Sequence, residues 1–259
     1  MRCTIMQPTY IPWLGYFDLI DQADIFVFLD NVQLVKRSWQ VRNKIKTAKG
    51  ILCLTIPVKK TKSRDETILC ETYITPGTLW KKKHLKSIQL SYKKTPYFDK
   101  IYSCIEKMIN KKEKTLSKFN INIIKNISRK IGIKKKFINT SKLKNIKGRK
   151  DTLLVNICKA IDCNSYLSPL GAAAYIERQS PGGEFAKNKI NLYYQNYKHP
   201  TYNQIYEDFL SHMSVIDLLF NHGFDQALEI IRKGRRKSIN YRSFSKKFSE
   251  PKYTQKNKK

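Results

Sequence analysis

Three short apolar runs, and the spacing between them, predict the start of a parallel β-sheet. Residues 3–6, 25–29 and 51–58 are largely apolar over the length of a strand, a pattern typical of strands that are buried on both faces. Residues 15–25 carry apolar side chains at the spacing of a helix that packs on a sheet. A strand, a helix and a second strand in this order indicate a right-handed crossover between parallel strands.

The rest of the chain alternates helical and strand patterns, with several helices together in the middle. Helices are predicted at 79–92, 98–109, 111–131, 151–161, 171–178, 214–220 and 224–232, and short strands at 137–139, 164–168 and 190–195. We therefore predict an α/β fold with a Rossmann-like parallel sheet, forming a single domain over residues 1–236 with a helical insertion at about 75–150. Residues 237–259 show little apolar pattern and are predicted to form a basic mobile tail.

Hydrogen-bonding and cationic side chains are concentrated directly after the second apolar run. This run ends at Asp30 and Asn31, and the carboxyl end of a buried parallel strand is where open α/β sheets bind ligands. Arginine and lysine side chains bind anions, and a tryptophan among them can stack on a planar or sugar-like group. We expect the substrate to be bound by Gln7, Tyr10, Gln33, Lys36, Arg37, Trp39, Arg42, Asn43 and Tyr202.

Two residues are candidates for proton transfer. Asp30 follows a buried strand and precedes the cationic residues, although pairing with Arg37 or Arg42 would explain it equally well. His199 follows a predicted strand, and histidine is the usual proton carrier near neutral pH. His84 lies among lysines and is expected to be solvated. No metal site is expected, because the six cysteines lack the paired spacing of zinc ligands.

Residues 6–43 also resemble a known protein family. The WbqC-like proteins carry a QPxYxPxxGY opening followed by ADxFVxLDxVQxxKRSWxxRN, and this chain matches both motifs, including Gln7, Tyr10, Gly15, Asp30, Gln33, Lys36, Arg37, Trp39, Arg42 and Asn43. Looser matches extend the resemblance over about residues 1–235. The resemblance implies a role in surface polysaccharide biosynthesis of the O-antigen (lipopolysaccharide) type.

The positive charge is the dominant feature of the composition. The chain of 259 residues has 51 Lys and Arg against 20 Asp and Glu, a net charge of +31. Such a surface attracts polyanions, but biased composition spread over solvated surfaces would produce the same count. No apolar run approaches the roughly 18 residues of a membrane span, and the first residues do not resemble a signal peptide. We therefore expect a cytoplasmic protein without an integral membrane segment.

These observations lead to a leading hypothesis and two alternatives. The leading one is a cytoplasmic transferase that adds an acyl or aminoacyl group, such as glycyl, to a nucleotide-linked amino sugar. Asp30 or His199 would accept the proton of the amine, and no cofactor is certain, because aminoacyl-tRNA, acyl-CoA and ATP plus a free acid all remain open as donors. The alternatives are a non-catalytic nucleic-acid (tRNA)-binding protein and a scaffold for membrane-associated glycan assembly, held on anionic lipid by its tail.

Overall fold

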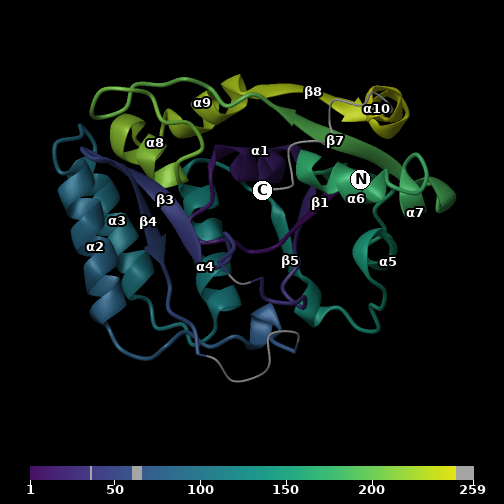
Figure 1. Cartoon of the computed structure of the whole chain (residues 1–259), viewed down its shortest axis with the longest axis horizontal. Coiled ribbons are helices and arrows are strands. Elements are labelled where there is room, and N and C mark those ends of the chain that lie inside the picture. Colours follow the sequence, from purple (N-terminus) through teal and green to yellow (C-terminus); the bar gives the residue numbers. More distant parts are fainter. Residues whose placement is uncertain (36, 60–65, 249–259) are drawn as a thin grey trace.

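The computed structural model describes residues 1–35, 37–59 and 66–248, without the side chains of residues 245–248. A six-stranded sheet runs through its centre (Figure 1). The strands lie in the order β5-β2-β1-β6-β7-β8, and all are parallel except β8, which is antiparallel to β7. Their bounds are β1 (Arg2–Met6), β2 (Ile25–Phe28), β5 (Lys136–Asn139), β6 (Ser165–Ser168), β7 (Asn191–Tyr197) and β8 (Arg235–Asn240).

Counted within this sheet alone, the strand order is 3-2-1-4-5-6, which is the order of the Rossmann fold. The predicted α/β class with a mostly parallel sheet is therefore confirmed. The order reverses between β1 and β6, because the chain leaves β1 towards one edge of the sheet and later returns to the other side of β1. This reversal is the place where open α/β sheets form a crevice at the carboxyl ends of their strands.

Helices cover both faces of the sheet, and the strand sequence shows why. In β2, Phe26 and Phe28 join the larger apolar cluster, whereas Ile25 and Val27 join the smaller one on the other face, as the two-residue period of a strand requires. The larger cluster includes apolar side chains of α1 (Leu14–Gln22), α8 (Val215–His222) and α9 (Ala227–Lys233). The smaller cluster includes those of α5 (Lys150–Ala160), α6 (Ala173–Ile176) and α7 (Gly183–Lys187).

The insertion begins earlier and ends earlier than the predicted 75–150, because it fills the interval between β2 and β5, and residues 136–139 are β5 of the main sheet. Between β2 and β5 lie the three expected helices, α2 (Leu79–Tyr92), α3 (Phe98–Asn110) and α4 (Leu116–Lys130), but also an antiparallel hairpin of β3 (Arg42–Thr47) and β4 (Gly50–Thr55). The expectation that residues 51–58 form a strand of the main sheet is wrong. Only one residue of β4 is buried, and a central parallel strand would have to be buried on both faces. The single turns η1 (Leu69–Glu71), η2 (Thr140–Lys142) and η3 (Leu170–Ala172) complete the fold.

The predicted tail also begins later than expected. Residues 237–240 are part of β8, and α10 (Tyr241–Phe248) follows directly. The ring of Phe244 is buried and lies 4.7 Å from that of Tyr194, so these residues cover the outer part of β7. Residues 249–259, the rest of the predicted tail, lie outside the described residues. A truncation after Lys237 would therefore remove half of β8 and all of α10, not a tail alone.

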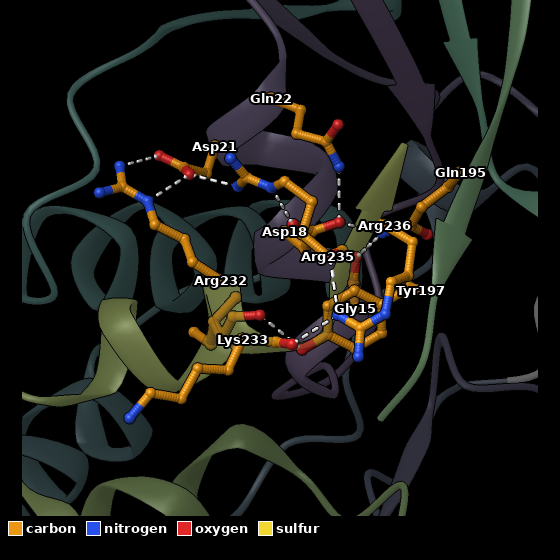
Figure 2. A network of polar contacts seen from close by, with 11 residues as sticks. Gly15, Asp18, Asp21, Gln22, Gln195, Tyr197, Arg232, Lys233, Arg235 and Arg236 are labelled. Atoms are coloured by element: carbon orange, nitrogen blue, oxygen red, sulfur yellow. Dashed lines mark hydrogen bonds and ion pairs between the residues drawn. The ribbon is translucent and has the colours of Figure 1, made fainter. Parts of the chain in front are cut away.

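A polar network fastens α1 to the C-terminal elements (Figure 2). The carboxylate of Asp18 is fully buried and accepts hydrogen bonds from Gln22, Gln195 and Arg235, each at 2.7 Å. Arg235 also pairs with Asp21, which in turn accepts two hydrogen bonds from Arg232 at 2.8 and 2.9 Å. The two arginines hold the pKa of Asp21 below its usual value. The position of α1 against the sheet therefore depends on ion pairs as well as on apolar packing.

We predict that Arg235→Met lowers the free energy of unfolding by about 2–3 kcal/mol, because the Asp18 charge then stays buried with only neutral donors. Urea denaturation near neutral pH measures this change. Arg232→Met is the matched control, because the Arg232 side chain is 52% exposed and Asp21, which is 6% exposed, keeps Arg235 as its partner in this variant. We expect a loss of under about 1 kcal/mol, since water screens the half-exposed guanidinium group. Equal losses of unfolding free energy in the two variants would show that the pair of Arg235 with the buried Asp18 stabilises the fold no more than the Arg232–Asp21 pair does.

Candidate functional site

A cavity of about 290 Å³ lies where the strand order reverses. Met6 ends β1 and is followed by Gln7, and Pro169 follows the last residue of β6; all three line the cavity. We call it the switch-point cavity. Its lining consists of Ile5, Met6, Gln7, Thr9, Leu29, Ser38, Trp39, Gln40, Leu154, Tyr166, Pro169, Ala172 and Tyr175. The location is the one that the Rossmann topology favours for a ligand.

The lining of this cavity is uncharged and largely apolar, with a few polar and aromatic groups. Amide and hydroxyl groups come from Gln7, Thr9 and Ser38, and phenol groups from Tyr166 and Tyr175. Burial raises the pKa of Tyr175 to about 12, so its hydroxyl keeps its proton at neutral pH and can donate a hydrogen bond. Such a cavity suits an uncharged ligand group that has both apolar faces and hydroxyls, as a sugar ring has, better than a bare anion.

Trp39 supplies an exposed aromatic face at this cavity. Its side chain is 49% exposed, and the ammonium group of Lys44 lies 5.4 Å from the ring centroid. The backbone oxygen of Trp39 accepts a hydrogen bond from the amide of Tyr10 at 2.9 Å, which fixes the residue beside the loop after β1. A partly exposed indole with a cation beside it is suited to stacking on a base or sugar ring next to a phosphate.

The structure divides the predicted cationic cluster between two cavities. Arg37 and Arg42 do not line the switch-point cavity; they line a second cavity of about 320 Å³ with Leu34, Val35, Val41, Thr55, Ile56 and Val58. We call this the arginine cavity. Residues 38–40, the dividing segment, run between the two. The sequence could not show this division, because neighbours along an irregular segment can face opposite sides.

The side chain of Gln40 holds the dividing segment in place. Its amide oxygen accepts hydrogen bonds from the backbone of Val35 at 2.9 Å and from the hydroxyl of Ser38 at 3.1 Å, while its amide nitrogen donates to Gln7 at 2.8 Å. Asn120 of α4 binds the Gln40 backbone oxygen at 2.8 Å. This buried amide therefore connects residues that line the two cavities.

The predicted proton acceptor Asp30 is 2% exposed. Its carboxylate accepts four hydrogen bonds, two from Ser141 at 2.8 Å and one each from Thr140 at 3.1 Å and Ser117 at 3.3 Å. These bonds tie the end of β2 to η2 and α4. The arrangement explains Asp30 as a positioning group, and the predicted pairing with Arg37 or Arg42 does not occur. A catalytic role for Asp30 stays a prediction.

His199 lies in a cluster of aromatic rings, away from the linings of both cavities. Its ring stacks on Trp13 at 6.1 Å and lies 4.9 Å from that of His212. Nδ1 donates to the Pro200 carbonyl at 2.9 Å, which leaves the lone pair on Nε2. Burial lowers the pKa to about 4, and among the described residues Nε2 has no hydrogen-bond partner. The ring is thus a neutral acceptor at pH 7, and its catalytic role stays a prediction.

Three of the predicted ligand contacts lie inside the structure instead of at a cavity. Tyr10 is fully buried and packs on Phe119, so a ligand would have to displace the core to stack on it. The amide of Asn43 donates to the backbone oxygens of residues 10 and 11 at 2.9 and 2.7 Å. Tyr202 donates to the buried Asp217 at 2.9 Å. These side chains shape the loops around the site and do not face it.

The Asp217 carboxylate belongs to a buried system that pattern reading missed. It accepts hydrogen bonds from Tyr92 at 3.0 Å and Gln204 at 2.7 Å, besides that from Tyr202. Nearby, the buried ammonium group of Lys46 donates to the backbone oxygens of Tyr206 at 3.1 Å and Asp208 at 2.6 Å. Burial raises the pKa of Asp217 and lowers that of Lys46. Together they hold the loop that follows His199.

Gln33 is exposed and forms an isolated bridge with Ile68, and it lines neither cavity. Lys36 lies outside the described residues. Thr9, Tyr166 and Tyr175 line the switch-point cavity but were not predicted from the sequence, whereas Ser38, which also lines it, belongs to the polar stretch that the sequence singled out. Only the pairing of β1 with β6 could have indicated the two tyrosines, because they lie far along the chain from Gln7. Within the described ranges, no group of three or more His, Cys, Asp or Glu side chains is placed to hold a metal ion.

The expectation that His84 is solvated is wrong, because its side chain is buried. Nε2 lies 3.1 Å from the Thr55 carbonyl, which can only accept, so Nε2 carries the proton. Nδ1 then accepts from the hydroxyl of Tyr10 at 3.0 Å. This neutral ring connects α2 with β4 and with the loop after β1. The lysines around it belong to the exposed face of the same helix.

Comparison with known proteins places the chain in a family. The model of the WbqC-like protein family matches residues 7–229. The chain belongs to the WbqC-like protein family. The chain is similar to the "Uncharacterized protein Rv1507c" of Mycobacterium tuberculosis (strain ATCC 25618 / H37Rv). The two are 31% identical over 224 residues, which cover 86% of this chain and 94% of that protein. No solved structure matches this WbqC-like chain significantly.

Along the described part of the chain, every helix is too short or too polar to cross a bilayer.

The pH dependence of stability tests the neutral state of His84. Burial lowers its pKa to about 4, whereas an exposed imidazole titrates near 6.5. The unfolded chain therefore takes up this proton first as the pH falls, and stability is lost between about pH 6.5 and pH 4, by at most about 3 kcal/mol.

We predict that His84→Gln, which keeps one donor and one acceptor, loses less stability than the wild type between about pH 7 and pH 4.5. Urea denaturation at the two pH values measures the difference. The loss that remains includes the contribution of His199, whose pKa is lowered in the same direction. An identical loss in the variant would mean that His84 is already protonated in the folded protein near pH 6.

Proposed function

We propose that the chain is a transferase that adds an acyl or aminoacyl group to a nucleotide-linked amino sugar bound at the switch-point cavity. The observation that carries this proposal is the uncharged cavity at the strand reversal of a Rossmann-order sheet, whose largely apolar lining includes hydroxyl, amide and aromatic groups. Ligands of this fold bind in that crevice. The polysaccharide context expected from the family resemblance supports a sugar nucleotide as the ligand.

In this proposal the two ends of the ligand meet different groups. The sugar lies among Gln7, Thr9, Tyr166 and Tyr175, which form hydrogen bonds to its hydroxyls. Trp39 stacks on a ring at the edge of the cavity, and Lys44, close to that indole, attracts the diphosphate. The net charge of +31 raises the local concentration of any such polyanion.

The transfer joins the amine nitrogen of the sugar to the carbonyl carbon of the donor. A C–N bond forms, the bond from that carbon to the donor's leaving group breaks, and the amine loses a proton to a base. The open donors remain aminoacyl-tRNA, acyl-CoA and ATP plus a free acid. Neither Asp30 nor His199 lines the cavity. Transfer of the amine proton to either residue therefore requires a proton relay or a movement of the loop that carries His199.

We predict that a UDP-linked amino sugar stabilises the protein in a thermal-shift titration at both low and high salt, and that Trp39→Ala weakens its binding about tenfold or more. The reason is the lost stacking, worth about 1–3 kcal/mol per ring. Tyr73→Ala is the matched control, because Tyr73 is 48% exposed and lines a different cavity. Equal affinity of the wild type and Trp39→Ala would remove the sugar nucleotide from this cavity.

A second candidate function, nucleic-acid binding, is favoured by one surface feature. A cavity of about 370 Å³ at α3 and α4 is lined by Lys100, Lys107, Lys111 and Lys130. Of these four lysines, Lys100 and Lys111 form ion pairs with other described residues, namely with Asp225 and Glu113 at 3.6 Å. A row of lysines along two helices can neutralise successive phosphates.

If this second function holds, affinity for bulk tRNA falls steeply with salt, and the slope of the logarithm of affinity against that of salt decreases by about 1 in Lys107→Gln and in Lys130→Gln. A filter-binding titration at several salt concentrations measures the slope. Lys187→Gln is the matched control, because Lys187 lies on α7, far from α3 in Figure 1. An unchanged slope in both cavity variants would mean that these lysines make no phosphate contact and that tRNA is attracted only by the overall charge of the protein.

A further inference from the structure

The arginine cavity combines two cations with an apolar wall. Arg37 and Arg42 line it together with Thr55 and five aliphatic side chains, Leu34, Val35, Val41, Ile56 and Val58. It shares no lining residue with the switch-point cavity. Its volume of about 320 Å³ is at the small end of the range for ligand pockets. The lining predicts a small ligand with an anionic end and an apolar end.

The two guanidinium groups are unpaired within the described part of the chain. No hydrogen bond, ion pair or ring contact there involves either side chain, whereas Arg232 and Arg235 both bind carboxylates of α1. Arginine presents a planar fork that matches the two oxygens of a carboxylate or phosphate. A hydrogen bond between such a guanidinium group and an anion is charge-assisted and stronger than one between neutral groups.

The backbone at both arginines is fixed by local hydrogen bonds and strand pairing. Arg37 has φ 57°, a left-handed conformation that costs a residue other than glycine about 1 kcal/mol. The Gln40 amide oxygen stabilises this turn through Val35 and Ser38. Arg42 begins β3 and pairs in register with Thr55 of β4, which places a hydroxyl on the strand beside its own. A strained residue held by a buried amide is typical of functional sites.

We infer that the arginine cavity binds a carboxylate or phosphate monoester carried on a short aliphatic chain, at a site separate from the switch-point cavity. The anionic end pairs with Arg37 and Arg42, and the chain packs on the aliphatic wall. This inference goes beyond the proposed function and does not rest on it. It requires only the composition and the geometry of the second cavity.

Five probes separate the two parts of this recognition. Octanoate and octyl phosphate carry both parts, and comparing them identifies the preferred head group. Octanamide lacks the charge, while butyrate and inorganic phosphate lack most or all of the chain. In isothermal titration at fixed ionic strength, we expect saturable binding of octanoate or octyl phosphate with one site per chain. We expect each of the other three probes to bind at least tenfold more weakly.

Variants then assign the site. Arg37→Gln and Arg42→Gln should each weaken the binding of the better probe at least tenfold. Val35→Glu should do the same while both arginines stay, because it places an anion in the lining; Val35 is 50% exposed, so the substitution is compatible with folding. Arg149→Gln removes an exposed arginine elsewhere and should change nothing. Trp39→Ala should also leave this binding unchanged, which keeps the result independent of the sugar-nucleotide titration.

Two outcomes would overturn the inference. One is binding of octanoate and octyl phosphate that is unsaturable, or equal in the wild type and in all three cavity variants, which would mean scattered attraction to a basic surface. The other is equal affinity for inorganic phosphate and octyl phosphate, which would mean that the aliphatic wall takes no part. Circular dichroism of each variant confirms that the fold is intact before the affinities are compared.

Discussion

The reversal of strand order beside β1 is the constraint on which the arrangement of this protein depends. β1 pairs in parallel with β2 on one side and with β6 on the other, so the connections that leave its two neighbours diverge. The carboxyl end of β1 is left without a covering crossover, and the loop after it can receive side chains from distant segments. Residues 7, 39, 166 and 175 meet there only because of this pairing.

A second level of organisation comes from the insertion between β2 and β5. Its first part, the dividing segment with the β3–β4 hairpin, closes one side of the switch-point cavity and forms the arginine cavity on its other side. Gln40 connects the two through hydrogen bonds to Gln7 and Val35. A buried amide with both its oxygen and its nitrogen bonded is costly to disturb. The two cavities are therefore expected to keep a fixed relation to each other.

Several conspicuous polar residues of the motif stabilise the structure around the cavities instead of lining them. The carboxylate of Asp30 joins β2 to η2 and α4, and the amide of Asn43 holds the loop after β1. Tyr10 and His84 form one buried pair between that loop and α2. A dense motif of this kind reflects the cost of leaving buried polar groups unpaired as well as contact with a ligand. Residue type alone does not separate the two causes.

The sequence by itself determined the α/β class, the parallel strands β1 and β2, the helices of the insertion and the concentration of polar residues after β2. These features depend on periodicity over neighbouring residues, which the chain carries locally. The tertiary structure alone decided that residues 42–55 form a hairpin, that residues 237–240 belong to the edge strand and residues 241–248 to a helix, and that Trp39 and Arg37 line different cavities. Each of these depends on which distant segment lies alongside, and pairing over long sequence separations is set by the packing of the whole chain, not by local preference.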